Sequence, residues 1–302
     1  MGDIAASTLA QLQNKAKETG RSYQLCLQLF CQEEFMRRLS VSKHIEKLVL
    51  KGGLFIYTLT EFDSRVTMDI DFLLNKISND EAEILQIVKD IIKTETANNF
   101  LTFEIKNVSP ISMQQKYNGW RVAIVGMIKN TRTPINIDFG VGDVIVPKPE
   151  KRKIKTQLEG FVSPEIYTYS LESVLAEKFD AIITRLELTS RMKDFYDIYY
   201  IAHSFDFEGE KLQDAIFETL HNRKTSYDDE TFERIENLSE IEVMRIRWKA
   251  FLKKIKTPEL ELKVVLDTIK IFIKPVFEAI LEERNFSNQW NSDKQKWKAE
   301  KN

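Results

Sequence analysis

Two aspartates separated by a single residue, Asp69 and Asp71, occupy the stretch RVTMDIDFLL at residues 65–74. The alternation of polar and apolar residues predicts a β-strand, on which alternate side chains share a face. Two carboxylates about 7 Å apart on one face repel each other, and a divalent cation removes that repulsion. The pair therefore predicts a Mg²⁺ or Mn²⁺ site suited to phosphoryl transfer, and the alternative is the solvent-facing edge of an ordinary strand.

The predicted strand has two different faces. The polar face is expected to carry Arg65, Thr67, Asp69 and Asp71. The apolar face, which would pack against the core, is expected to carry Val66, Met68, Ile70 and Phe72.

A pair of glycines precedes this strand. Gly52 and Gly53 end the short apolar run KLVLKGG. Without a Cβ in the way, a phosphate can approach the backbone amides of a glycine turn or of a helix N-terminus. We expect the two glycines to contact nucleotide phosphates, unless they form an ordinary turn.

A third carboxylate follows in PINIDFG, residues 134–140, which predicts another strand with Asn136 and Asp138 on its polar face. If the two strands are neighbours, Asp138 joins Asp69 and Asp71. Three converging carboxylates suit a two-metal centre. A single exposed aspartate on an edge strand is the alternative.

The segment SLESVLAEKFDAIITRLEL predicts a helix that opens near Ser170. Lys178 falls inside the apolar stripe of this helix, and Arg185 lies seven residues further along nearly the same line. Lysine is a point charge on a flexible stem, so Lys178 could face a nucleotide phosphate and Arg185 could extend the contact. The alternative is a lysine whose ammonium group reaches past the apolar surface to water.

A second helix is predicted in SRMKDFYDIYYIA, with Ser190 as its N-cap and Asp194 and Asp197 on one side. Carboxylates on a mostly buried helix need partners. Lys178, Arg185 or Arg191 could supply them in a structural network, or one aspartate could position a substrate hydroxyl.

These residues require a mixed sheet followed by helices. Apolar spacing predicts helices at 4–18 and 22–39, and a further helix after residue 75. Strands are predicted near 100–111, 119–130 and 133–146, and residues 170–285 are almost wholly helical in pattern. The basic connector at 148–155 separates a domain of residues 1–160 from one of residues 161–302. A last helix or a loosely held tail is expected after Arg284.

Composition narrows the class of protein. The chain has 302 residues and a net charge of −2, which excludes a global positive field for nucleic acids or membranes. Two cysteines and three scattered histidines suggest neither a disulfide framework nor a zinc site. We expect no membrane span, and we expect a cytoplasmic location. Any RNA contact must be local. The connector is one candidate, but a solvated basic loop is the favoured interpretation of it.

The ordered motifs KGG, RxTxDID, IDFG and LAEKF with SRMKDFYD resemble those of the AbiEii/AbiGii toxin family, nucleotidyltransferases of abortive infection and of type IV toxin–antitoxin systems. The resemblance runs from the early helix to about residue 203. It implies an α+β fold, a polymerase-β-like nucleotidyltransferase core with a mixed β-sheet followed by an α-helical C-terminal domain. It also implies transfer of a nucleoside monophosphate from an NTP with release of pyrophosphate, and a cognate antitoxin encoded nearby. Related toxins act on tRNA ends.

The resemblance assigns roles to individual residues. Gly52 and Gly53 would hold the triphosphate, Lys178 would contact a nucleotide phosphate, and Asp194 would be a late catalytic aspartate. Many nucleotidyltransferases have Gly-Ser where this chain has Gly-Gly, so the hydroxyl contact to phosphate would be absent or supplied elsewhere. The expected metal ligands are Asp69, Asp71 and Asp138. The expected nucleotide-binding residues are Gly52, Gly53, Arg65, Thr67, Lys178 and Arg185.

In the expected mechanism, metal ions held by the aspartates bridge the NTP phosphates and activate an acceptor hydroxyl, while Asp138 accepts its proton. The expected acceptor is RNA, with tRNA the first candidate. Two alternatives stay open: a nucleotidyltransferase that modifies a small molecule or a protein, and a noncatalytic NTP-binding module.

Overall fold

The computed structural model describes residues 3–111 and 119–299. The chain forms two compact units. The N-terminal unit comprises Met1–Gly142 and Pro149–Tyr169, and the C-terminal unit comprises Asp143–Lys148 and Ser170–Asn302. The chain therefore enters the C-terminal unit briefly and returns before it crosses for good after Tyr169, whereas the sequence suggested one boundary near residue 160.

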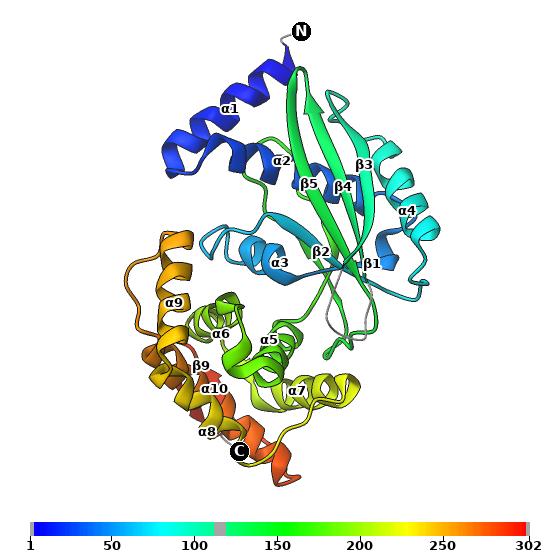
Figure 1. Cartoon of the computed structure of the whole chain (residues 1–302). Coiled ribbons are helices and arrows are strands. Elements are labelled where there is room, and N and C mark those ends of the chain that lie inside the picture. The colour runs from blue at the N-terminus through cyan, green and yellow to red at the C-terminus, as the bar shows by residue number, and fades with distance from the viewer. Residues whose placement is uncertain (1–2, 112–118, 300–302) are drawn as a thin grey trace. The chain divides into compact units, whose positions relative to one another are not determined.

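The N-terminal unit is a seven-stranded mixed sheet with helices (Figure 1). Its strands are β1 (Leu48–Lys51), β2 (Asp69–Leu74), β3 (Leu101–Ile111), β4 (Gly119–Ile128), β5 (Thr131–Gly140), β6 (Glu150–Lys153) and β7 (Glu165–Thr168). The strand order is β3-β4-β5-β2-β1-β7-β6. The β2/β5 and β1/β7 pairs are parallel, and the other pairs are antiparallel. The mixed sheet confirms the α+β class.

The helices of this unit are α1 (Ile4–Thr19), α2 (Tyr23–Ser40), the 3-10 helix η1 (Ile45–Lys47), α3 (Gly52–Leu59) and α4 (Glu81–Lys93). Helix α2 contacts β5, β7 and α4, and nearly all of it is buried. Apolar residues recur along α4 at Ile84, Ile87, Val88 and Ile91, which gives it one buried face. The two N-terminal helices and the strands expected near 100–140 are confirmed.

Helix α2 carries charges into the core. Arg37 pairs with Glu33 at 3.1 Å and with Glu34 at 3.2 Å, and Arg38 pairs with Glu34 at 3.2 Å. Each of these side chains is less than a tenth exposed. Burial raises the pKa of Glu33 to about 7, against the opposing charge of Arg37. The network fixes α2 to the rest of the unit, because Arg38 also donates to the backbone carbonyl of Leu101.

Strand β2 is shorter than expected and begins at Asp69. From there the predicted alternation is confirmed, with Ile70 and Phe72 buried and both aspartates half-buried. The expectation that Val66 and Met68 pack in the core was wrong, because they are 40% and 48% exposed. The Met68 carbonyl accepts hydrogen bonds from two glutamine side chains of α2 rather than from a neighbouring strand, so the chain is not yet in the sheet.

The C-terminal unit is mainly helical (Figure 1). Its helices are α5 (Leu171–Arg185), η2 (Leu186–Leu188), α6 (Met192–Ser204), α7 (Gly209–Arg223), α8 (Thr231–Glu236), η3 (Asn237–Glu240), α9 (Glu242–Ile255) and α10 (Leu262–Leu281). Helix α5 opens after Ser170 as predicted, and the Ser170 hydroxyl accepts from the Ser173 amide. Arg191, rather than the expected Ser190, precedes the first turn of α6.

The described part of the tail, residues 285–299, contains no helix and is held by strand pairing, so that expectation was wrong. It forms a hairpin of β9 (Gln289–Asn291) and β10 (Lys296–Lys298) that pairs with β8 (Phe207–Glu208). The Trp290 ring packs on Phe272 with centroids 4.7 Å apart, and its indole N–H donates to the Ala202 carbonyl. Tryptophan side chains supply enough apolar area to hold so short a hairpin in place.

No helix in the described part of the chain is both long enough and apolar enough to cross a bilayer.

Candidate active site

Four charged residues form one row across the middle of the sheet, here called the carboxylate row: Lys51, Asp71, Asp138 and Arg121. Lys51 on β1 pairs in register with Asp71 on β2, which pairs with Asp138 on β5, which pairs with Arg121 on β4. Residues in register on neighbouring strands lie on the same face of a sheet. Because β2 and β5 are neighbours, the two strands predicted to carry aspartates do bring them together.

Asp69 lies two residues before Asp71 on the same face and pairs in register with Asn136. The Asn136 amide donates to Asp69 Oδ1 at 3.2 Å. The Asp69 side chain is 37% exposed and that of Asp138 is 16% exposed. The three expected carboxylates therefore share one partly open face in the N-terminal unit.

The glycine pair lies against this face. Gly52 has a φ of 71°, and a Cβ built on it would lie 2.8 Å from Asp71 Cγ and overlap Asp71 Oδ2. A Cβ on Gly53 would lie 3.0 Å from Thr67 Oγ1 and 3.6 Å from Arg65 Nη2. Strand β1 ends and α3 begins at these glycines, so the first amides of a helix lie beside the carboxylates. Arg65 and Thr67 lie there too, although neither belongs to a strand.

Arg121 is the cation that pairs with Asp138 and Asp69. Its Nε and Nη2 donate to the two oxygens of Asp138 at 2.6 Å each, and Nη2 also reaches Asp69 Oδ2 at 3.3 Å. The hydrogen bonds to Asp138 and the nearby negative charges raise the pKa of Arg121 further above its ordinary value. Asp138, the proposed third metal ligand, is thus held by a two-pronged guanidinium contact.

A divalent cation fits Asp69 and Asp71 better than it fits all three carboxylates. Among the described residues, no three histidine, cysteine or acidic side chains are grouped closely enough to hold a metal ion alone. Mg²⁺ commonly takes only one or two carboxylates and completes its shell with water and substrate phosphates. Asp71 under the glycine turn and Asp69 beside it supply such a pair of hard oxygen donors.

The other expected residues lie in the C-terminal unit, where Lys178 is 8% exposed. Its ammonium group lies 2.5 Å from Asp197 Oδ2 and 3.4 Å from Asp194 Oδ1. Arg191 donates to Asp194 Oδ2 at 2.6 Å. These four residues, here called the lysine–aspartate cluster, show that the carboxylates of α6 have Lys178 and Arg191 as partners.

The lysine–aspartate cluster contains two cationic and two acidic side chains. Burial by itself would raise the pKa of Asp194, but Lys178 and Arg191 outweigh burial and hold that pKa below its ordinary value. The side chain of Arg185, at the end of α5, forms no hydrogen bond or ion pair with any described residue, although the charges of Asp194 and Asp180 act on it from a longer distance. Burial and the neighbouring charge of Arg191 lower its pKa. Arg185 is therefore a cation beside the cluster that is not matched by a contacting carboxylate.

Lys51 and Arg121 were missed by sequence reasoning. Arg121 stands within the otherwise apolar run WRVAIVG, and such an interruption was a usable signal. Lys51 directly precedes the glycine pair, and its Nζ lies 5.1 Å from the centroid of the Tyr169 ring. Their place in the row depends on strand register, which one sequence does not give.

The fold and the motifs agree with comparisons to known proteins. The chain is similar in structure to MenT4, a nucleotidyltransferase toxin from Mycobacterium tuberculosis, with a TM-score of 0.52 and 14% identity over 92% of this chain and 99% of that one. It is also similar to JHP933 from Helicobacter pylori, with a TM-score of 0.48 and 14% identity over 87% and 98% of the two chains. At this identity the likeness to MenT4 concerns the fold.

A search of curated protein sequences finds no match. The family model described as the nucleotidyl transferase AbiEii toxin of type IV toxin–antitoxin systems matches residues 34–283. That match includes the carboxylate row, the glycine pair and the lysine–aspartate cluster. The chain therefore belongs to the AbiEii family of nucleotidyltransferase toxins of type IV toxin–antitoxin systems.

Proposed function

We propose that this nucleotidyltransferase uses a divalent cation to transfer a nucleoside monophosphate from an NTP to an RNA hydroxyl, with tRNA as the first candidate acceptor. The observation that carries the proposal is the packing of Gly52 against the Asp71 carboxylate. It brings helix amides, which suit phosphate, next to acidic oxygens, which suit a cation.

The N-terminal unit supplies the groups for the triphosphate. The amides at Gly52 and Gly53 would donate to phosphate oxygens, and Arg65 and Thr67 lie within reach of the same turn. The Thr67 hydroxyl lies where it can replace the hydroxyl that a Gly-Ser turn would provide. Asp69 and Asp71 would hold the cation, for which Mg²⁺ or Mn²⁺ is the expected metal. When bound, that cation would neutralise charge on the triphosphate and favour ionisation of the acceptor hydroxyl.

The chain's own residues account for the remaining roles. The acceptor oxygen would bond to the α-phosphorus as the bond from that phosphorus to the pyrophosphate oxygen breaks. The hydroxyl proton would pass to a carboxylate, with Asp138 as the proposed acceptor. Both Asp138 oxygens accept hydrogen bonds from Arg121, so Arg121 must loosen its contact for Asp138 to take that proton.

Lys178 and Arg185 are the proposed phosphate contacts of the C-terminal unit. Arg185 has no contacting carboxylate and so suits an anionic ligand. Lys178 is shared by Asp194 and Asp197, which fix the direction of its ammonium group. We propose that Asp194 acts in catalysis as the resemblance predicts, and that Asp197 orients Lys178.

The test is transfer of label from each α-labelled NTP to total tRNA in the presence of Mg²⁺ or Mn²⁺, with the wild type, Asp71→Asn and Asp229→Asn. Asp229 is an exposed loop residue and serves as the matched control. Label on tRNA that falls at least about 100-fold in Asp71→Asn and persists in Asp229→Asn is the expected result. Unlabelled tRNA with label on protein or on a small molecule would reject the RNA acceptor.

A protein or small-molecule acceptor is the second candidate, because the net charge of −2 gives no overall attraction for RNA. The family implies a cognate antitoxin, whose co-expression should suppress toxicity in cells. NTPs and tRNA are both cytoplasmic, so the proposal places the protein in that compartment.

A further inference from the structure

Helix α9 concentrates positive charge on a chain that is slightly negative overall. Its sequence EVMRIRWKAFLKKI has five cationic residues and one carboxylate, and Lys256 follows directly. The net charge of the whole chain is −2. An excess of this size over so short a segment creates a local positive field even in a near-neutral protein.

The cations of α9 face outward in an ordered way. Met244, Trp248 and Leu252 form its buried side. At 100° per residue, the cations Arg245, Lys249 and Lys253 form a stripe along one edge of that buried side. Successive members of the stripe are about 6 Å apart along the helix axis. Such a row suits a ligand whose negative charges repeat at a regular spacing.

Carboxylates do not neutralise this row. Arg245, Lys249, Lys253 and Lys254 are exposed, and none of them forms an ion pair with a described residue. Lysines on the neighbouring helix α10 behave differently, because Lys270 pairs with Glu236 at 2.8 Å and Lys274 with the same carboxylate at 3.8 Å. Arg245 donates to the backbone carbonyls of Ser239 and Glu240, which leaves Lys249, Lys253 and Lys254 as the exposed cations of α9 without an ion pair to a described residue.

The α9 helix is fastened beside the lysine–aspartate cluster, within the same unit. Arg247 Nη1 donates to the backbone carbonyls of Glu187 and Thr189 at 3.0 and 2.9 Å. These carbonyls belong to the segment that joins α5 to α6, directly after Arg185. The Tyr196 ring of α6 also packs on Phe251 of α9, with centroids 5.8 Å apart. Helix α9 thus contacts both the segment that follows Arg185 and helix α6.

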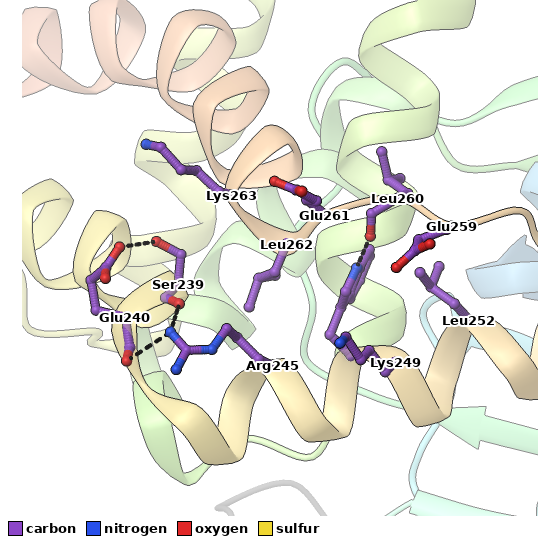
Figure 2. Close-up of a pocket in the computed structure, with 11 residues that line it drawn as sticks. Ser239, Glu240, Arg245, Lys249, Leu252, Glu259, Leu260, Glu261, Leu262 and Lys263 are labelled. Carbon is purple, nitrogen blue, oxygen red and sulfur yellow. Dashed lines mark hydrogen bonds between the residues drawn. The ribbon is translucent and has the colours of Figure 1, made fainter.

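A pocket of about 340 Å³ lies along one side of α9 (Figure 2). Trp248, Leu252 and Leu262 line it with apolar surface, and Arg245 and Lys249 lie on the α9 side. The lining also includes Glu240, Glu259 and Glu261, so the pocket itself does not suit a phosphate group. Arg245 and Lys249 border this acidic pocket, whereas the exposed residues Lys253, Lys254 and Lys256 lie outside its lining and carry the anion-binding character.

We infer that the exposed face of α9 binds the phosphate backbone of the acceptor RNA. The inference rests on the proposed function for its choice of RNA as the partner. The binding surface, here called the α9 face, consists of Lys249, Lys253, Lys254 and Lys256. A polyanionic backbone matches a row of lysines without requiring base-specific contacts. The connector at 148–155 fits this role less well, because Lys151 pairs with Glu165, Arg152 with Glu150, and Lys155 with Glu61.

The test measures binding of fluorescently labelled total tRNA to the full-length protein without NTP, across a series of salt concentrations. One variant carries Lys249→Gln, Lys253→Gln and Lys254→Gln. The matched control carries Lys211→Gln, Lys270→Gln and Lys274→Gln, which removes the same charge from lysines that have carboxylate partners. A third variant changes Lys151, Lys153 and Lys155 to Gln. Circular dichroism and NTP binding establish that each variant is folded.

The α9 variant is expected to bind tRNA about 10–100-fold more weakly, and the slope of log affinity against log salt should fall by about 2. The control and connector variants should bind within about twofold of the wild type. Equal weakening in all three variants, or weakening in the connector variant alone, would overturn the inference, as would a wild type that does not bind tRNA.

Label transfer from NTP separates this inference from the proposed function. Weakened tRNA binding in the α9 variant, with no transfer to tRNA even by the wild type, would support the α9 face and reject the reaction. Normal transfer and normal tRNA binding by the α9 variant would retain the reaction and reject the α9 face. Loss of neutralisation by the co-expressed antitoxin, with tRNA binding intact, would assign the surface to a protein partner and overturn the inference.

Discussion

Arg121 holds Asp138 by two hydrogen bonds of 2.6 Å, so the carboxylate expected to be a third metal ligand already has a cation of its own. The same guanidinium reaches Asp69 at 3.3 Å. A positive charge at this place competes with a divalent cation for the same oxygens and repels it. Arg121 is therefore expected to limit how tightly the aspartates bind metal.

Replacement of Arg121 should strengthen metal binding. We expect Arg121→Ala to bind Mn²⁺ about tenfold more tightly than the wild type, because Asp138 becomes available and a nearby positive charge is lost. Titration followed by electron paramagnetic resonance of free Mn²⁺ measures both affinity and stoichiometry. Arg132→Ala is the control. Arg132 lies on β5, next to the strand of Arg121, but its side chain is 64% exposed and its nearest carboxylate oxygen, on Glu104, is 3.6 Å away. Unchanged or weaker Mn²⁺ binding in Arg121→Ala would contradict the competition.

Gly52→Ala should strongly reduce nucleotidyl transfer while the protein stays folded. The new Cβ would overlap the Asp71 carboxylate and would block the approach of phosphate to the helix amides. Gly160→Ala is a matched control, because Gly160 also has a positive φ, 82° against 71° for Gly52, but has nothing within 4 Å of the added atom.

Gly160→Ala should lose about 1 kcal/mol of stability from the left-handed backbone, and Gly52→Ala should lose more because Asp71 must also shift, as measured by urea unfolding. Only Gly52→Ala should lose transfer activity, by about 100-fold or more. Similar activity in the two variants would mean that the glycine turn does not contact the nucleotide.

Much of this architecture was accessible from the sequence because local rules determine it. The α2, α4 and α5 helices follow apolar spacing, and Asp69 and Asp71 share a face because β2 alternates. The sequence could not show that β2 and β5 are neighbours, because pairing between residues 67 positions apart is a tertiary property. Strand register places Arg121 beside Asp138, and register cannot be predicted from the periodicity of one sequence.

Local sequence patterns gave wrong predictions where tertiary contacts determine the structure. Val66 and Met68 alternate like strand residues, but the Met68 carbonyl is taken by Gln28 and Gln32 of α2, so the strand starts later. The tail was expected to be a last helix or loosely held, because the apolar partner of Trp290 is Phe272 on a helix distant in sequence. The basic connector suggested a linker, yet Glu150–Lys153 pairs with β7 at the edge of the sheet.

Lys178 supports both the stability and the proposed chemistry of the C-terminal unit, and a pair of variants separates the two roles. Lys178→Met leaves Asp194 and Asp197 buried near each other with one cation fewer, and should cost about 3–5 kcal/mol of unfolding free energy. Adding Asp197→Asn removes the carboxylate that lies 2.5 Å from Lys178 in the wild type, so the double variant should regain part of that loss. Asp194 keeps Arg191 as its partner in both variants.

Transfer activity should stay low in the double variant, because methionine has neither a positive charge nor a hydrogen-bond donor for a phosphate. Asp197→Asn alone provides the control for the altered carboxylate. Restoration of activity together with stability would show that Lys178 acts only as a structural ion-pair partner.

Glu33 should make stability depend on pH near neutrality. Burial raises its pKa in the folded protein to about 7, above the ordinary value of 4.5 that applies once the chain unfolds. A raised pKa means that the folded state binds the proton more tightly, so this stabilisation is fully present below about pH 4.5 and is lost as the pH rises through 7. The wild type should therefore lose about 2 kcal/mol of unfolding free energy between pH 5 and pH 8 from this group. In Glu33→Gln, which keeps the size and the acceptor oxygen, that loss should vanish. Urea unfolding of both proteins at the two pH values measures the difference, and equal pH dependence in the two would show that Glu33 stays ionised beside Arg37 throughout.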